Sequence, residues 1–580
     1  MNNALNQYKL WLESGFVDMN TKNELLNIEN DEQEINERFY QNLSFGTAGL
    51  RGIIGAGTNR MNIYTVRKAT QGLAMVIAEH GNKAKERGVA IAYDSRLYSD
   101  TFAQEAAKVL AANGIRAYLF DSLRPTPELS FAIRHLNCIA GIIITASHNP
   151  AKYNGYKVYW EDGAQMPPQN ADKVLEYINK IDIFEDVKVL NTLDANNSGL
   201  ITYIGKEVDE AYLANVYAQS INPGLIKQAG DNLKVVYTPL HGAGNKLVRK
   251  ILSMLGVENV FVVREQEAPD PNFSTVKCPN PEDPEVFSYS VKLAKETGSP
   301  LIIGTDPDSD RMGLMVRNQN GEYVPLSGNQ VGVLLINYIL TQRAGKGMLP
   351  DNPVLVKTIV TTEMAQKVCD DYGIQMNNVL TGFKYIGEII KNLEEKNQEN
   401  RYLFGFEESY GYLAGTYARD KDAVVATMLT VEMAAWYTMR GMTVYEGLQE
   451  LFEKYGYYKE MQKSYTLEGI SGIQKRQEIV DNLRDNVPEI FGNAKVVAVR
   501  DYLKGVRKDF VNNTEKALTL PKSDVLYYEL SDGTYFVVRP SGTEPKIKFY
   551  LFVNGKTNAE ADKNMDGLWN SVSELIKTLL

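Results

Sequence analysis

The chain has little cysteine and little histidine. Its 580 residues include only three cysteines, Cys138, Cys278 and Cys369, and four histidines. The cysteines are odd in number, lie far apart and form no C-x-x-C pair. This pattern argues against a disulfide framework or a structural zinc site and favours reduced thiols in a cytoplasmic protein. The few histidines also argue against a histidine-rich metal centre.

The chain also lacks an excess of positive charge and a membrane-spanning apolar run. Its formal net charge is −10, which argues against nucleic-acid binding but still allows a local basic pocket for an anionic substrate. The N-terminus shows no basic stretch followed by an apolar core, so we expect no signal peptide. The longest apolar segment, residues 423–439, contains Glu432, which predicts a buried helix rather than a membrane span. We therefore expect a cytoplasmic protein with no nucleic-acid or membrane partner.

What is present is an ordinary globular composition, 44% hydrophobic and 23% charged, in a chain long enough for several domains. Strand-like apolar runs alternate with helical patterns. They predict an α/β fold of three similar domains with mixed, mostly parallel, helix-covered sheets, over residues 1–205, 206–324 and 325–457. Beyond residue 458 the strand-like runs are joined by the hairpin signal Ser531-Asp532-Gly533. This change predicts a different, α+β domain over residues 458–580.

A polar loop with the sequence T-A-S-H-N-P, residues 145–150, follows the apolar run 140–144. Such a run predicts a buried strand, and the loop then lies at the strand's C-terminal end, where α/β sheets bind ligands. Ser147, flanked by His148, is therefore a candidate nucleophile or phosphate carrier. A serine hydrolase is disfavoured, because Ser147 is not in a G-x-S-x-G turn.

A second loop, with the sequence T-D-P-D-S-D-R over residues 305–311, also follows a predicted strand. Asp306, Asp308 and Asp310 alternate along the chain, so an extended backbone directs their carboxylates to one side, where they repel one another unless a cation binds. Oxygen ligands of this kind select Mg²⁺ or Ca²⁺. An EF-hand fits poorly, whereas an aspartyl-phosphatase nucleophile or a solvated acidic turn would also suit these residues. We predict a Mg²⁺ site.

Two further loops offer groups for a phosphosugar. Arg539, followed by Ser-Gly-Thr at residues 541–543, supplies a guanidinium, hydroxyls and backbone N–H groups to an anion, although the same residues suit an ordinary turn. Glu407 and Ser409, in the run 405–411, supply acceptors and a donor to vicinal sugar hydroxyls, or form a polar surface loop.

In order, these four loops resemble the four signature loops of the α-D-phosphohexomutases, a family that includes phosphoglucomutases and phosphomannomutases. The resemblance extends from Phe45 to Lys548. It implies three similar α/β domains and a different fourth domain around a central cleft. The aromatic residues of the run 405–412 and the run 419–423 resemble the branch that holds phosphoglucomutases, phosphopentomutases and glucose-1,6-bisphosphate synthases.

The resemblance also implies a role for individual residues. Ser147 is similar to the serine that carries the phosphate, and its oxygen together with Asp306, Asp308 and Asp310 would hold one Mg²⁺ ion. The groups around the transferring phosphoryl would be Arg51, His148, Lys157 and Arg311, with Lys157 transferring the proton. The implied substrate-binding residues are Thr381, Gly382, Lys384, Glu407, Ser409, Lys421, Arg539, Ser541, Gly542 and Thr543.

The expected activity is the interconversion of α-D-glucose 1-phosphate and glucose 6-phosphate. It would proceed through phosphorylated Ser147 and glucose 1,6-bisphosphate, which would also act as the activating primer. The same mechanism would serve a phosphopentomutase or a phosphomannomutase. Two hypotheses from different classes are a transferase that synthesises glucose 1,6-bisphosphate from a phosphoryl donor and a non-catalytic sugar-phosphate sensor. In each case the expected partner is a small phosphosugar.

Overall fold

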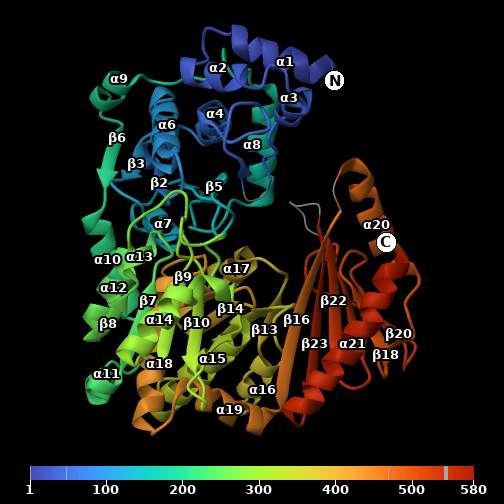
Figure 1. Ribbon diagram of the computed structural model, residues 1–580. Helices are drawn as coiled ribbons and strands as arrows, with labels where there is room; N and C mark the ends of the chain where they lie inside the picture. The colour runs from blue at the N-terminus through green and yellow to red at the C-terminus, as the bar shows by residue number, and fades with distance from the viewer. Residues whose placement is uncertain (1, 47–48, 468, 541–545, 580) are drawn as a thin grey trace.

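The computed structural model describes residues 2–46, 49–467, 469–540 and 546–579. Three α/β units and a fourth, β-rich unit follow one another along the chain. In Figure 1 the first unit lies at the top, the second and third lie below it, and the fourth lies at the right. The expected fold class, three α/β domains followed by a domain of another type, is confirmed.

The first sheet has the strand order β1-β5-β4-β2-β3-β6. Its strands are β1 (Leu50–Ile53), β2 (Val89–Tyr93), β3 (Ala117–Phe120), β4 (Ala140–Ile144), β5 (Tyr153–Trp160) and β6 (Ile201–Ile204). Its helices are α1 (Asn2–Glu13), α2 (Met19–Leu26), α3 (Glu32–Phe39), α4 (Ile63–Glu79), α5 (Asn82–Arg87), α6 (Ser99–Ala112), α7 (Thr126–His135), α8 (Pro168–Lys180) and α9 (Thr192–Asn197). Along β4, Ile142 and Ile144 pack with α4, α6 and α8, whereas Ile143 packs with α7 on the opposite face. Burial on both faces is why this strand is a continuous apolar run.

The second and third sheets repeat part of this arrangement, in the orders β11-β10-β9-β7-β8 and β13-β12-β14-β15. Their strands are β7 (Lys234–Thr238), β8 (Asn259–Val262), β9 (Leu301–Thr305), β10 (Met312–Arg317), β11 (Tyr323–Leu326), β12 (Val354–Thr358), β13 (Asn377–Val379), β14 (Tyr402–Glu407) and β15 (Gly411–Ala414). The second unit's helices are α10 (Lys206–Tyr217), α11 (Gly224–Ala229), η1 (Gly230–Asn232), α12 (Gly244–Leu255), α13 (Arg264–Glu267), η2 (Pro284–Phe287) and α14 (Ser288–Thr297). The third unit's are α15 (Gly328–Gly345), α16 (Met364–Asp370), α17 (Phe383–Glu394), η3 (Glu399–Arg401), α18 (Ala423–Met439) and α19 (Val444–Tyr455).

One topological feature recurs in all three units and positions the predicted loops. Strands β4, β9 and β14 each pair in parallel with one neighbour and continue through a hairpin into an antiparallel one, β5, β10 or β15. The serine loop, the acidic loop and the Glu407 loop are these three hairpin connections. Each contains one non-glycine residue with positive φ: Ser147 at 52°, Ser309 at 50° and Tyr410 at 64°. The same backbone device therefore forms three of the four predicted loops.

Helix α18 is buried in the body of the protein. It contacts α11 and α12 of the second unit as well as β15 of its own. The Glu432 carboxylate within it accepts hydrogen bonds from the backbone N–H groups of Ile221 and Asn222, at 2.8 and 2.7 Å, and from Tyr338 Oη at 2.6 Å. These partners compensate the cost of burying the carboxylate. Among the described residues, no helix is long and apolar enough to cross a membrane.

The fourth unit is an antiparallel sheet in the order β16-β23-β22-β21-β18-β19-β20, with β17 paired to β18. Its elements are β16 (Tyr457–Thr466), α20 (Gly469–Asp485), β17 (Ile490–Phe491), β18 (Ala494–Asp501), β19 (Val506–Asp509), β20 (Thr514–Ala517), β21 (Leu526–Leu530), β22 (Tyr535–Pro540), β23 (Lys546–Gly555) and α21 (Asn558–Leu579). The predicted hairpin at 531–533 joins β21 to β22. Ile359 and Val360 of the third unit pack against Tyr527 and Tyr535 of this sheet.

The domain boundaries at 205, 324 and 457 remain a proposal. The strand β6 ends at Ile204, β11 runs to Leu326, and β16 begins at Tyr457. The proposed divisions therefore lie within two residues of these strand ends.

Candidate active site

Ser147 occupies the turn directly after β4, with its backbone in the left-handed region at φ 52°. A non-glycine residue in this region is uncommon and often marks a functional position. The backbone N–H of Ser147 donates to Thr145 Oγ1 at 2.8 Å, and its Oγ lies 3.2 Å from His148 Nδ1. The same Oγ donates a hydrogen bond to Asp306 Oδ2 at 2.8 Å. The serine hydroxyl of the first unit is thus in contact with the acidic loop of the second.

The three aspartates of that loop are buried and close together. One oxygen from each of Asp306, Asp308 and Asp310 lies within 4.8 Å of the others. Burial, followed by repulsion from the neighbouring carboxylates, raises the pKa of Asp306 and Asp310. Asp308 Oδ1 and Asp310 Oδ1 are buried without a hydrogen-bond partner. Buried, mutually repelling carboxylates with unpartnered oxygens fit a hard divalent cation such as Mg²⁺.

Asp308 is held by two donors from the first unit. Lys157 Nζ on β5 donates to its Oδ2 at 2.8 Å, and Thr126 Oγ1 at the start of α7 donates to the same atom at 2.9 Å. Burial by itself would raise the pKa of Asp308, but the ammonium of Lys157 and these hydrogen bonds hold that pKa well below its usual range. Lys157 therefore brings a positive charge into the cluster from the strand that follows the serine loop.

Lys421 and Glu407 extend the cluster into the third unit. Lys421 Nζ lies 3.1 Å from Asp310 Oδ2 and 2.9 Å from Asp420 Oδ1. Burial raises the pKa of Glu407, with Lys421 as the main opposing charge, and its Oε1 accepts a hydrogen bond from the backbone N–H of Gly382 at 2.9 Å. Gly411 leaves room for the lysine stem, because a Cβ there would lie 2.2 Å from Lys421 Cδ.

Two more predicted residues flank the serine loop. Arg311 is half-buried beside the acidic loop and pairs with Glu282 at 2.6 Å. His148 is half-buried, and burial, followed by the charges of Arg311 and Arg51, lowers its pKa well below the usual value. The imidazole is therefore neutral at pH 7. Arg51 itself lies on β1 and is exposed.

A second group of predicted residues lies where the third and fourth units meet. Burial lowers the pKa of Lys384, and the positive charge of Arg539 on β22 lowers it further. Thr381 Oγ1 is buried without a hydrogen-bond partner, and Ser409 is half-buried. Lys384 and Arg539 thus place two cations near each other. The predicted Ser541, Gly542 and Thr543 lie outside the described residues.

Some residues in or beside the site lie outside the four loops that the sequence pattern indicated. Thr126 contacts Asp308 from a position 182 residues away in the chain, and Glu282 pairs with Arg311 from a segment without regular structure. Arg96 follows β2, and only its place after a buried strand could have indicated a role.

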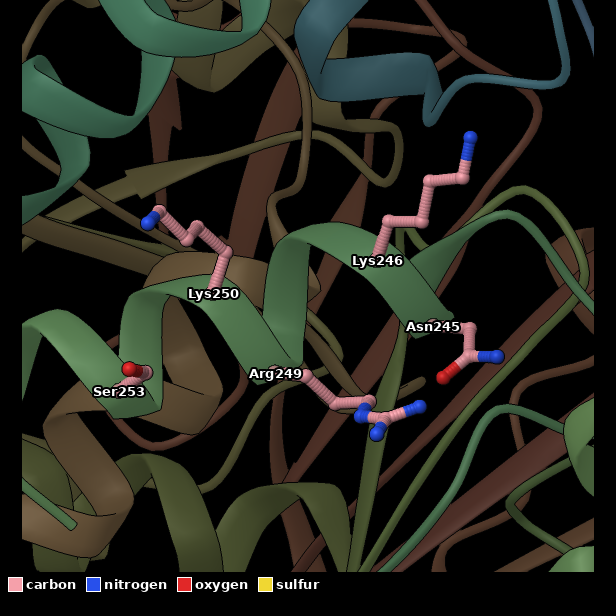
Figure 2. Close-up of a pocket in the computed structure, with 5 residues that line it drawn as sticks. All are labelled: Asn245, Lys246, Arg249, Lys250 and Ser253. Carbon is pink, nitrogen blue, oxygen red and sulfur yellow. The ribbon is translucent and has the colours of Figure 1, made fainter.

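A surface pocket on α12 is separate from this cluster. Figure 2 shows the residues that line it, with the long side chains of Lys246, Arg249 and Lys250 extending away from the helix. Arg249 pairs with Glu267 at 2.5 Å. None of the pocket residues is among those predicted for the site.

Comparison with known families gives three matches in succession. Residues 42–184, 210–321 and 327–455 match domains I, II and III of the family described as phosphoglucomutase/phosphomannomutase, alpha/beta/alpha. These segments span more than half of the chain. The chain is also 38% identical over 524 residues to the phosphoglucomutase of Staphylococcus haemolyticus, covering 89% of this chain and 91% of that one. The phosphoglucomutase of Staphylococcus epidermidis is 38% identical over 540 residues, with 93% and 96% covered.

Solved structures share the fold at lower identity. A putative phosphomannomutase from Thermus thermophilus superposes with a TM-score of 0.67 at 21% identity, covering 93% of this chain and 99% of that one. The open form of parafusin, a phosphoglucomutase from Paramecium, superposes with a TM-score of 0.66 at 18% identity, covering 93% and 95%.

Proposed function

Because the chain belongs to the phosphoglucomutase/phosphomannomutase family, we propose that it is a phosphoglucomutase, which interconverts α-D-glucose 1-phosphate and glucose 6-phosphate. Its relatives of that name match nearly the whole chain rather than one domain. Such an enzyme is an isomerase, because its net reaction shifts the phosphate from one position of the sugar to another.

The observation that carries the proposal is the contact between Ser147 Oγ and Asp306 Oδ2 at 2.8 Å, inside a group of three buried aspartates. A hydroxyl that carries a phosphoryl group needs neighbours that offset the charge of the phosphate. The aspartates at 306, 308 and 310, with an oxygen of phosphorylated Ser147, would hold one Mg²⁺ ion. Mg²⁺ at this position supplies charge neutralisation for the phosphoryl group.

In the proposed reaction, phosphorylated Ser147 donates its phosphoryl group to the 6-hydroxyl of glucose 1-phosphate. The bond between phosphorus and Ser147 Oγ breaks and a bond to the sugar oxygen forms, while Lys157 gives a proton to Ser147 Oγ and takes up the proton of the sugar hydroxyl. The product is glucose 1,6-bisphosphate. This intermediate then reorients in the site, its 1-phosphoryl group is transferred to Ser147 Oγ, and the proton of that hydroxyl passes to O1 of the glucose 6-phosphate that is released. Glucose 1,6-bisphosphate from solution would prime any enzyme whose Ser147 is not phosphorylated.

Lys157 is proposed to hold and move the proton in each transfer, because it lies on the strand after the serine loop and contacts Asp308 at 2.8 Å. Arg51, His148 and Arg311 would offset charge around the phosphoryl group. Glu407 and Ser409 would bind the ring hydroxyls in either orientation. The phosphate that does not react would be bound by Arg539 with Ser541, Gly542 and Thr543. Further positions facing the sugar and its phosphate would be Thr381, Gly382, Lys384 and Lys421.

The test is a kinetic comparison of glucose 1-phosphate, mannose 1-phosphate and ribose 1-phosphate, each with and without glucose 1,6-bisphosphate. We expect the highest kcat/KM for glucose 1-phosphate and stimulation by catalytic amounts of the bisphosphate. A dominant rate with ribose 1-phosphate would identify a phosphopentomutase instead. Net production of bisphosphate from a phosphoryl donor would identify a synthase.

A further inference from the structure

The side chain of Arg96 donates hydrogen bonds to four backbone carbonyl groups in and just after the serine loop. This side chain is fully buried. Nη2 donates to the carbonyl oxygens of Ser147 and Asn149, both at 2.5 Å. Nη1 donates to those of Pro150 and Tyr153, both at 3.0 Å. One guanidinium therefore binds the carbonyl of the reacting serine, two more carbonyls of its loop and that of the first residue of β5.

The arginine is itself fixed in place by Asp94 at the end of β2. Arg96 Nε lies 3.3 Å from Asp94 Oδ2, and Asp94 Oδ1 accepts hydrogen bonds from the backbone N–H of Arg96 at 2.9 Å and from Ser99 Oγ at 2.7 Å. Because β2 pairs with β4, this arrangement ties the serine loop to the sheet from a neighbouring strand. The planar, five-donor guanidinium suits this geometry, whereas a lysine ammonium has only three donors around one nitrogen.

The second unit also contacts Arg96. The Cζ atom of Arg96 lies 5.0 Å from the ring centroid of Phe273, which is buried and has a φ of 47°. Phe273 belongs to the segment 268–275, which His241 holds through both ring nitrogens at 2.8 Å. Two residues beyond His241, the backbone N–H of Ala243 donates to the carbonyl oxygen of Pro307 in the acidic loop at 2.8 Å. The same part of the second unit therefore touches both Arg96 and the acidic loop.

We propose that Arg96 is a positioning residue for phosphoryl transfer: it sets the conformation of the Ser147 loop and, through Phe273, the placement of that loop against the acidic loop. The inference rests on the proposed mutase function. It assigns to Arg96 no contact with the substrate. In-line transfer is sensitive to small displacements, and a shift of about 1 Å can cost about 100-fold in rate. Loss of the guanidinium should therefore lower kcat and leave KM nearly unchanged.

The test compares Arg96→Lys with a matched control, Arg87→Lys. Arg87 precedes β2 and also donates to carbonyl groups, those of Asn137 and Cys138 at 2.9 and 3.1 Å, but these lie before β4 rather than after it. For Arg96→Lys we expect kcat to fall about 100-fold, with KM for glucose 1-phosphate within about threefold of the wild type. Arg87→Lys should keep the wild-type kcat. A third variant, Phe273→Leu, should lower kcat by a smaller factor, again with little change in KM.

Two further measurements separate positioning from general loss of structure. Guanidinium ions added to Arg96→Gly should restore part of kcat, which a misfolded protein would not show. Amide hydrogen exchange over residues 145–153 should be faster in Arg96→Lys than in the wild type or in Arg87→Lys, whether or not the enzyme turns over. An unchanged kcat, or unchanged exchange in that segment, would overturn the inference. Absence of mutase activity in the wild type, with exchange altered as expected, would instead refute the proposed function.

Discussion

Ser147 Oγ donates a hydrogen bond to Asp306 Oδ2 at 2.8 Å across a separation of 159 positions in the chain. Ser147 lies in the loop after β4 of the first sheet, and Asp306 directly follows β9 of the second sheet. Their contact joins the proposed phosphate carrier to the proposed cation site.

Replacement of Ser147 by alanine should abolish turnover, because it removes the hydroxyl that is proposed to carry the phosphate. We expect kcat to fall by at least about 10⁴-fold, while binding of glucose 1-phosphate is retained. A dehydrogenase-coupled assay measures the first quantity and titration calorimetry the second. Ser198→Ala, which removes a hydroxyl at the end of α9, is the control. Substantial activity in Ser147→Ala would rule out a phosphoserine mechanism.

Replacement of Asp306 by asparagine should have opposite effects on stability with and without Mg²⁺. Burial and the neighbouring carboxylates raise the pKa of Asp306, so without a cation the neutral amide relieves repulsion and should raise Tm. In the wild type, Mg²⁺ at 100 times its Kd should add about 2.7 kcal/mol of stability, and the variant should gain less. Thermal unfolding with EDTA and with Mg²⁺ measures both. If Mg²⁺ stabilised the wild type and the variant equally, the cation would bind at a site that does not involve Asp306.

Replacement of Lys157 by methionine should lower kcat by about 10²- to 10⁴-fold, the range typical of a lost general acid–base group. Substitution by arginine should restore the ion pair with Asp308 and little of the rate, because arginine does not release its proton. Steady-state kinetics of the two variants, with Lys173→Met on α8 as the control, test this role. Full activity in Lys157→Arg would assign the residue to charge compensation alone.

Replacement of Glu460 by glutamine should change how stability depends on pH. Burial raises the pKa of this β16 side chain to about 7, while the side chains of Thr362 and Asn329 oppose the rise. The folded state thus binds the proton more tightly than the unfolded state, whose pKa is about 4.3. Protonation of Glu460 therefore stabilises the folded state. This stabilisation is complete below about pH 4.3 and is lost as the pH rises through about 7.

Glu460→Gln should therefore be more stable than the wild type at pH 8, by up to about 3 kcal/mol, and should lose less stability between pH 5 and pH 8. Differential scanning fluorimetry at the two pH values measures this difference. The control is Glu453→Gln, which changes an exposed carboxylate on α19. Parallel pH profiles in Glu460→Gln and the wild type would contradict the prediction.

Much of the local structure follows from patterns in the sequence. The apolar run before Ser147 predicted β4, and the run 423–439 predicted the buried helix α18. Both depend on side chains close together in the chain, so periodicity reveals them. The roles of Thr126 and Arg96 were missed, because their partners lie on other strands and loops. Arg96 binds backbone carbonyl groups of the serine loop. Every residue has such a group, so the residue types do not show which carbonyls accept these hydrogen bonds.

The sequence by itself determined the fold class and the composition of each loop: a serine, three alternating aspartates, a glutamate and an arginine, each at the end of a strand-like run. Only the tertiary structure decided that Asp306 faces Ser147, that Lys157 contacts Asp308 and that Lys421 reaches Asp310 from the third unit. Local patterning sets where strands and turns form, because it depends on near neighbours. Contacts between loops depend on how three separate sheets pack, and that packing is set by buried surfaces distributed over the whole chain.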